Sequence, residues 1–219
     1  SGKTTLASVL QDLAGWSVFH MDDFFLQPWQ RTELRMQTAG GNVDYERFLA
    51  EILEPLKKGE TEIAYRPYQC RHQKLAEPVY IKAKQVCLME GSYSCHPALW
   101  DFYDLRIFLT VSPQEQKRRI LARNGEDGYM PFAKQWIPLE EQYIKSRNGV
   151  TYTLHCADVN PSNYYILKIG FIFCRIYLAA LQENVSPDIM VELISSFERN
   201  GAALNGKFGV APRAIYEYF

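Results

Sequence analysis

The sequence has no excess of charge of either sign. Its 24 lysines and arginines stand against 25 aspartates and glutamates, which leaves a net charge of -1 over 219 residues. Proteins that bind nucleic acid or anionic membranes usually carry a basic surface, so we expect neither as a partner. The hydrophobic share of 47% and the charged share of 22% are typical of a globular protein. The length is enough for one α/β domain with a sizeable core, or for one domain and part of another.

Cysteine pairing motifs are absent as well. The cysteines form no C-x-x-C pair and are odd in number: Cys70, Cys87, Cys95, Cys156 and Cys174. No secretory signal opens the sequence, and Lys168 and Arg175 interrupt the most apolar run, residues 164–181. We therefore expect a buried helix in that run and no membrane span, and a reduced, cytoplasmic setting for the protein.

The first residues match the end of a phosphate-binding loop. The motif G-x-x-x-x-G-K-[ST] ends in residues that Gly2, Lys3 and Thr4 supply, while its first glycine is absent from the sequence. In such a loop the backbone N–H groups and the next helix hold nucleotide phosphates, and the apolar spacing over residues 4–13 predicts that helix. Because the match is short, a polar chain end without this function is the alternative.

Carboxylates follow two stretches that we expect to be buried strands. Residues 16–21 run into Asp22 and Asp23, and the apolar run 85–89 ends at Glu90. Parallel α/β sheets place their chemistry at the carboxyl ends of strands, and a nucleotide-bound Mg²⁺ needs a carboxylate close by. The alternative for each of these acids is the capping of the next turn.

Helices and strands alternate along the rest of the chain. Strands are expected at residues 62–68, 79–83, 105–111 and from 157 on, and helices at 45–54, 97–103, 112–124 and 138–147. Asp44 is the expected N-cap of the helix that Pro55 closes. The alternation predicts an α/β fold with a parallel sheet and helices on both faces. The strand that normally precedes a phosphate loop is missing from the sequence.

A basic cluster lies on the helix expected at residues 112–124. Arg118, Arg119 and Arg123 could form a solvated helix face, which is the usual meaning of such a run. In a phosphotransferase, arginines on a mobile lid offset the charge of the transferring phosphoryl group. Residues 125–131 have the composition of such a lid, so both interpretations stay open at this point.

Five segments of the chain occur in an order that resembles one enzyme family. They are SGKTT (residues 1–5), HMDDFF (20–25), NVDYERF (42–48), EGSY (90–93) and RRILAR (118–123). Together they resemble the uridine kinase and phosphoribulokinase family of P-loop kinases, above all its compact bacterial uridine kinase-like members. The resemblance implies a P-loop NTPase-like kinase domain in residues 1–159, cut inside its phosphate loop. Residues 160–219 are expected to form a helical segment or the start of a second module.

The resemblance implies a nucleotide and metal site at the start of the chain. ATP is the implied cofactor, bound by Ser1, Gly2, Lys3, Thr4 and Thr5. The second implied cofactor is Mg²⁺, and the resemblance implies that Thr4 and Glu90 bind it. These assignments rest on the family's motif and not on the spacing alone.

The other matches imply catalysis and acceptor binding. Asp22 would accept the proton of the acceptor hydroxyl, while Lys3, Arg119 and Arg123 would offset charge on the phosphoryl group. The residues implied in acceptor binding are Asp44, Tyr65 and Tyr68. For the two tyrosines, aromatic packing in a hairpin is the alternative.

The sequence thus predicts a kinase that transfers the γ-phosphate of ATP to a hydroxyl of a small molecule. The resemblance favours a nucleoside such as uridine as that acceptor. A kinase for another sugar- or vitamin-like alcohol is one alternative, and a catalytically inactive nucleotide-binding regulatory module is another. The acceptor is the only expected partner class, and self-association into a homo-oligomer is left open.

Overall fold

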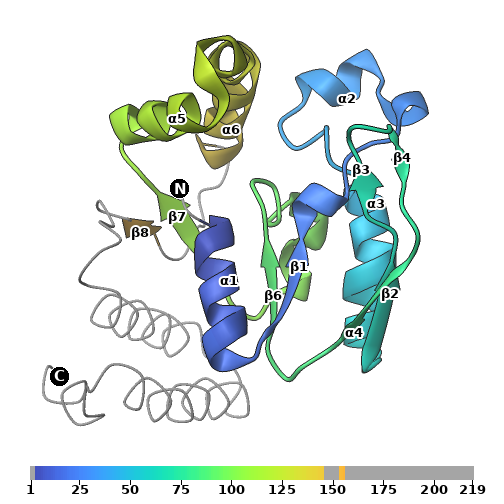
Figure 1. Ribbon diagram of the computed structural model, residues 1–219. Helices are drawn as coiled ribbons and strands as arrows, with labels where there is room; N and C mark the ends of the chain where they lie inside the picture. Colours follow the sequence, from blue (N-terminus) through green and yellow to red (C-terminus); the bar gives the residue numbers. More distant parts are fainter. Residues whose placement is uncertain (1–2, 146–152, 156–219) are drawn as a thin grey trace, which may run out of the picture.

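The computed structural model describes residues 3–145 and 153–155 (Figure 1). Its α-helices are α1 (Lys3–Ala14), α2 (Glu33–Gln37), α3 (Tyr45–Phe48), α4 (Glu54–Lys57), α5 (Pro113–Pro131) and α6 (Ile137–Lys145). Shorter 3₁₀ or π-helical segments are η1 (Met21–Asp23), η2 (Pro28–Gln30), η3 (Leu49–Leu53), η4 (Pro97–Phe102) and η5 (Phe132–Trp136). The strands are β1 (Ser17–His20), β2 (Glu62–Tyr65), β3 (Tyr68–Gln69), β4 (Lys74–Leu75), β5 (Val79–Lys82), β6 (Cys87–Glu90), β7 (Phe108–Thr110) and β8 (Thr153–His155). None of the helices in these residues has the length and apolar character needed to cross a bilayer.

The parallel strands form two separate pairs. β1 pairs with β6, and β7 pairs with β8, both in parallel. The other two pairs, β2 with β5 and β3 with β4, are antiparallel. Parallel pairing is therefore confirmed, but β7 is shorter than expected and β8 comes earlier than the strand expected from residue 157. That later stretch, Ser1, Gly2 and the segment 160–219 lie outside the described residues.

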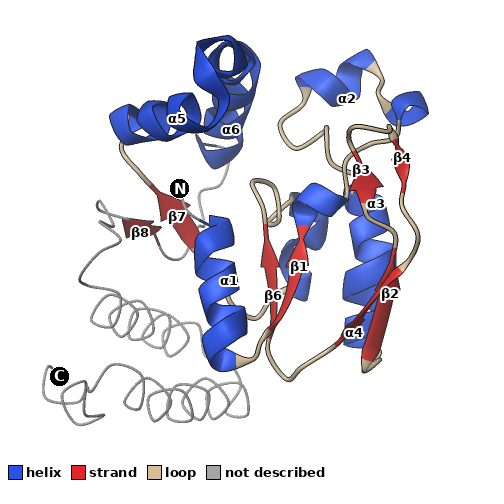
Figure 2. Cartoon of the chain, viewed as in Figure 1, coloured by secondary structure: helices blue, strands red, loops and turns tan. Residues whose placement is uncertain are grey.

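Aromatic and aliphatic side chains join β1 to the helical segment that α3 begins. Phe19 of β1, Phe48 of α3 and Ile52 of η3 are fully buried in one cluster. Phe24 packs edge-on against Phe48 with 4.9 Å between ring centroids, and it stacks on Tyr65 at 5.2 Å. Helix α1 contacts β1 and β6 from the other side, so helices cover both faces of this pair (Figure 2). The core thereby fixes the chain that follows β1.

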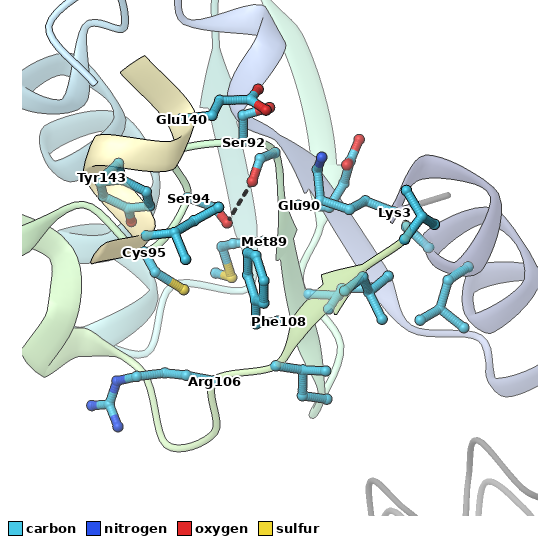
Figure 3. A pocket seen from close by; sticks show the side chains of 18 of the residues that line it. Lys3, Met89, Glu90, Ser92, Ser94, Cys95, Arg106, Phe108, Glu140 and Tyr143 are labelled. Atoms are coloured by element: carbon cyan, nitrogen blue, oxygen red, sulfur yellow. Dashed lines mark hydrogen bonds between the residues drawn. The ribbon is translucent and has the colours of Figure 1, made fainter. Parts of the chain in front are cut away.

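A cavity of about 400 Å³ with a mainly apolar lining lies between β6 and β7. Among the described residues β6 pairs only with β1 and β7 only with β8, so each has one edge without a strand partner. Figure 3 shows Met89 of β6 and Phe108 of β7 pointing into this cavity, with Lys3 and Glu90 at its border. A missing central strand in the sheet stays a prediction.

The helix that begins at Asp44 continues past Pro55. The Arg47 backbone N–H donates to Oδ1 of Asp44 at 3.1 Å, which confirms the expected N-cap. We expected the helix to end at Glu54, closed by Pro55 and then by residues 57–59, but α3, η3 and α4 run on without a gap through Pro55 to Lys57. The π-helical segment explains the difference. The Glu54 N–H donates to the carbonyl of Leu49, five residues back, so the bonding pattern is already shifted where proline lacks its N–H.

The segment with the expected composition of a lid, residues 125–131, is helical. Gly125 interrupts α5 with a φ of 70° and a ψ of -179°, a conformation that glycine adopts without strain. Beyond this break the chain is helical again through η5 into α6. Tyr129, Phe132 and Trp136 stand at helical spacing, a pattern that the glycine-rich composition of the segment concealed. The expected end of the helix near Gly125 is confirmed as a break in α5, and the lid role of residues 125–131 stays a prediction.

Candidate functional site

Three chain segments meet at the carboxyl ends of β1 and β6. The parallel register pairs His20 with Glu90, so η1 and the end of β6 lie side by side. The first turn of α1 reaches the same place, since the Thr4 hydroxyl lies 3.2 Å from one Glu90 carboxylate oxygen and 3.4 Å from the other. The structure therefore brings together Lys3, Thr4, Asp22 and Glu90 on the lining of one cavity, as the sequence predicts.

Glu90 is a buried carboxylate with two hydrogen-bond partners. Nδ1 of His20 lies 2.7 Å from Oε1 of Glu90, and the Thr4 hydroxyl donates to the same group. Burial alone would raise the pKa of Glu90, but the hydrogen bonds from His20 and Thr4 outweigh it and lower the pKa. The bond to Glu90 in turn raises the pKa of His20, although burial opposes the shift. Glu90 is therefore held ionised and in a fixed orientation.

Asp22 is the second carboxylate of the site. Desolvation among the atoms of the cavity floor raises its pKa, and the negative charge of Glu90 raises it further, while Lys3 and His20 oppose both effects. A carboxylate with a raised pKa binds a proton more readily than an ordinary aspartate. Asp22 is thus suited to accept a proton from a hydroxyl group that enters the cavity.

The cavity around these groups has a volume of about 660 Å³, which is within the usual range for small-molecule sites. We call it the site cavity. Its floor is Lys3, Thr4, Thr5, Met21, Asp22, Glu90, Gly91 and Ser92. One wall includes Phe25, Asn42 and Val43, which follow β1 and η1 in sequence, together with Tyr93 after β6. The other wall comes from α5, η5 and α6 and includes Arg119, Arg123, Phe132, Trp136 and Glu140. A polar floor therefore lies between walls that carry aromatic rings.

The two arginines assigned to catalysis lie on the same side of the site cavity. Arg119 and Arg123 both line it from α5. Nε of Arg119 donates to Oε1 of Glu115, which also accepts from Arg118. These hydrogen bonds lower the pKa of Glu115 to about 2. Arg119 is therefore held by a carboxylate at the cavity edge, where an anionic group could replace that partner.

The three residues assigned to acceptor binding do not line the site cavity. Asp44 is buried as the N-cap of α3 and accepts a hydrogen bond from Gln30. The Tyr65 hydroxyl donates to Oδ2 of Asp23 at 2.9 Å, and burial raises its pKa. The Tyr68 hydroxyl accepts a hydrogen bond from Arg31, and both tyrosine rings are buried. Their role in acceptor binding stays a prediction, and the structure gives each of them a packing role.

His20 and the aromatic walls were not found from the sequence. His20 carried a signal, because it is the last residue of the strand that leads to the acid pair, and parallel pairing places Glu90 opposite it. Phe25 carried no comparable signal, because it packs partly against the core as well as lining the site cavity. Phe132 and Trp136 could be assigned to this site only once the helix after Gly125 was placed over the floor.

The oxygen donors of the floor fit a magnesium ion. Within residues 3–145 and 153–155, no group of three or more His, Cys, Asp or Glu side chains is placed to hold an ion. Mg²⁺ does not need such a group, since it commonly uses one or two carboxylates together with water and substrate phosphates. The convergence of the Thr4 hydroxyl and the Glu90 carboxylate offers two oxygens at one point.

Comparison with known proteins identifies the fold. No family model matches the chain, and no curated protein matches it. Among solved structures it is similar to a possible uridine kinase from Bacillus stearothermophilus, with a TM-score of 0.50 and 20% sequence identity. The match covers 66% of this chain and 76% of that one. The chain therefore shares the α/β fold of that structure.

Proposed function

We propose that the protein is an ATP-dependent kinase that phosphorylates a hydroxyl group of a small molecule, preferably a nucleoside such as uridine. The observation that carries the proposal is the meeting of Lys3, Thr4, Asp22 and Glu90 on one cavity floor, with arginines on the wall above. The fold supports it, because the similar solved structure is described as a possible uridine kinase. The alternative acceptors remain other sugar- or vitamin-like alcohols.

In this proposal Asp22 is the general base. Its pKa is raised, so it can take the proton of the attacking hydroxyl as the new bond to phosphorus forms. Glu90 cannot replace it easily, because His20 and Thr4 occupy its carboxylate and lower its pKa. The two acids therefore have different tasks, which their different surroundings set.

The positive groups of the site offset the charge of the transferring phosphoryl group. Lys3 does so from the first turn of α1, and Arg119 and Arg123 do so from α5. Arg119 must exchange its bond to Glu115 for one to the phosphoryl oxygens. Thr4 and Glu90 would hold Mg²⁺, which supplies charge neutralisation at the phosphates when it is bound.

A comparison of two neighbouring aspartates tests the proposal. ADP release by the full-length protein is measured with a coupled assay over a panel of nucleosides and other alcohols, and ATP binding is measured by calorimetry. Asp22→Asn should lower the acceptor-dependent rate by about 100-fold or more, since general bases contribute that much, while ATP binding stays nearly unchanged. Asp23→Asn is the matched control, because the Asp23 carboxylate is held by Tyr65 and is assigned no part in transfer.

Two results would overturn the proposal. Transfer that survives Asp22→Asn would show that another group takes the proton. ATP binding without acceptor-dependent ADP release from any compound would favour the inactive nucleotide-binding module.

A further inference from the structure

We infer that the walls of the site cavity bind a flat aromatic ring of the acceptor, between Phe25 on one side and Trp136 with Phe132 on the other. The inference rests on the proposed function and specifies which end of the acceptor lies where. The hydroxyl would reach Asp22 at the floor, and the ring would lie between the aromatic walls. The resemblance had implied acceptor binding by Tyr65 and Tyr68 instead.

The wall that carries Phe25 is fixed by backbone hydrogen bonds. Phe25 forms a β-bridge with Val43, and the Leu26 N–H donates to the carbonyl of Asn42 at 3.1 Å. Phe24 is fully buried in the core, and Phe25 after it packs partly against that core and lines the site cavity. Its ring is thus presented to the cavity by a rigid scaffold, which lowers the entropy cost of binding.

The opposite wall is carried by η5. Phe132 and Trp136 both line the site cavity and are partly exposed. The guanidinium of Arg123 lies 5.8 Å from the centroid of the Phe132 ring, which is within the range of a cation–π contact. The aromatic surface for the acceptor on η5 therefore lies next to an arginine for the phosphoryl group on α5.

The chemistry of the walls favours a ring over a polyhydroxylated chain. Aromatic side chains stack on the faces of flat heterocycles, and every nucleobase has such a face. The Asn42 amide on the first wall offers both a donor and an acceptor to the polar edge of a ring. A sugar alcohol without a ring system would place its hydroxyls against the aromatic faces, where they lose hydrogen bonds to water without replacement.

Trp136 provides a direct test. The sequence contains four tryptophans, all within the described residues, and of these only Trp136 lines the site cavity. Pyrimidine and purine nucleosides should quench the fluorescence of the full-length protein, whereas sorbitol should not. Trp136→Phe should abolish the quenching and keep the acceptor KM within about threefold, because phenylalanine retains a stacking face. Trp136→Ala should raise the acceptor KM by about 5- to 150-fold, the usual contribution of one stacked ring, and leave the KM for ATP unchanged.

A control variant and several possible results distinguish the ring site from the proposed function. Trp29→Ala removes a tryptophan that is 76% exposed and outside the site cavity, and it should change neither KM. An unchanged acceptor KM in Trp136→Ala, or an equal rise in the KM for ATP, overturns the inference. If no acceptor supports ADP release, the proposed function fails, but quenching by nucleosides that Trp136→Phe abolishes would still support the ring site. Absence of quenching in a protein that does phosphorylate nucleosides would reject the ring site alone.

Discussion

Replacing Asp44 with alanine removes a carboxylate that is only 4% exposed and holds several groups at once. One of its oxygens accepts the Arg47 backbone N–H at 3.1 Å and caps α3. The other accepts from Nε2 of Gln30 at 2.9 Å and lies 3.6 Å from Nε of Arg47. We therefore expect Asp44→Ala to destabilise the fold, whatever Asp44 does in substrate binding.

The magnitude follows from these contacts. Loss of an N-cap costs about 1 kcal/mol, and loss of the hydrogen bond from Gln30 costs about 1 kcal/mol more. Arg47 keeps a carboxylate partner in Glu51 at 3.3 Å and the carbonyl of Asp23 at 3.1 Å, so its lost pairing adds only about 1 kcal/mol. The sum is about 3 kcal/mol, which corresponds to a fall in Tm of about 6–12 °C for a chain of this length.

Two further variants separate the causes. Asp44→Asn keeps an oxygen for the cap but turns an NH₂ group toward the Gln30 amide. That amide cannot simply rotate, because its oxygen accepts the Gln27 N–H at 2.8 Å. We expect Asp44→Asn to lose about half as much free energy of unfolding as Asp44→Ala. Glu46→Ala on the same helix removes a carboxylate that is 51% exposed and pairs with Arg35, so its loss should stay below about 1 kcal/mol.

Urea unfolding followed by circular dichroism measures the three free energies of unfolding. The m-values should agree among the variants, since all bury the same core. If Asp44→Ala loses no more free energy of unfolding than Glu46→Ala, the buried network around Asp44 does not stabilise the fold and the reasoning is refuted. The acceptor KM of Asp44→Asn tests the separate prediction that Asp44 binds the acceptor.

Two other variants address the site. The pKa of His20 is raised above its usual 6.5 and that of Glu90 is lowered below its usual 4.5, so their pairing stabilises the fold fully between about pH 4.5 and 6.5. The pairing weakens above that window as His20 deprotonates and below it as Glu90 protonates. His20→Gln should therefore lower the free energy of unfolding most inside the window. A loss of free energy that does not depend on pH would contradict the pairing. Gly91→Ala should cost more than about 2 kcal/mol in the same assay, because φ is 151° and a Cβ would lie 2.4 Å from the Cβ of Met21. Gly59→Ala, with a φ of 82° and open space around it, is the control and should cost only about 1 kcal/mol; equal losses would speak against the close approach.

Features that depend on neighbouring residues could be predicted from the sequence. The cap at Asp44, the start of α5 and the break at Gly125 are set by side chains and backbone preferences within one turn, and the structure has all three. The acids at the ends of β1 and β6 were also placed correctly, because a buried apolar run that stops at a carboxylate is a local pattern. Their meeting in one site followed from parallel pairing, which the alternation of helices and strands predicts.

Features that depend on distant partners could not be predicted in this way. The π-helical segment before Pro55 and the helix beyond Gly125 are stabilised by how each segment packs, which overrides composition and the usual effect of proline. The hydroxyl partners of Tyr65 and Tyr68 come from other segments, Asp23 and Arg31, so the sequence had no means to assign them.

The sequence by itself determined the class of fold and the polar floor of the site, because phosphate-loop, strand-end and arginine motifs are short and local. Only the tertiary structure decided which surfaces surround that floor. The walls come from segments more than a hundred residues apart, Phe25 after β1 and Trp136 in η5, and no local pattern specifies that they line the same cavity. Their positions follow from core packing around β1 and from the helix that resumes after Gly125.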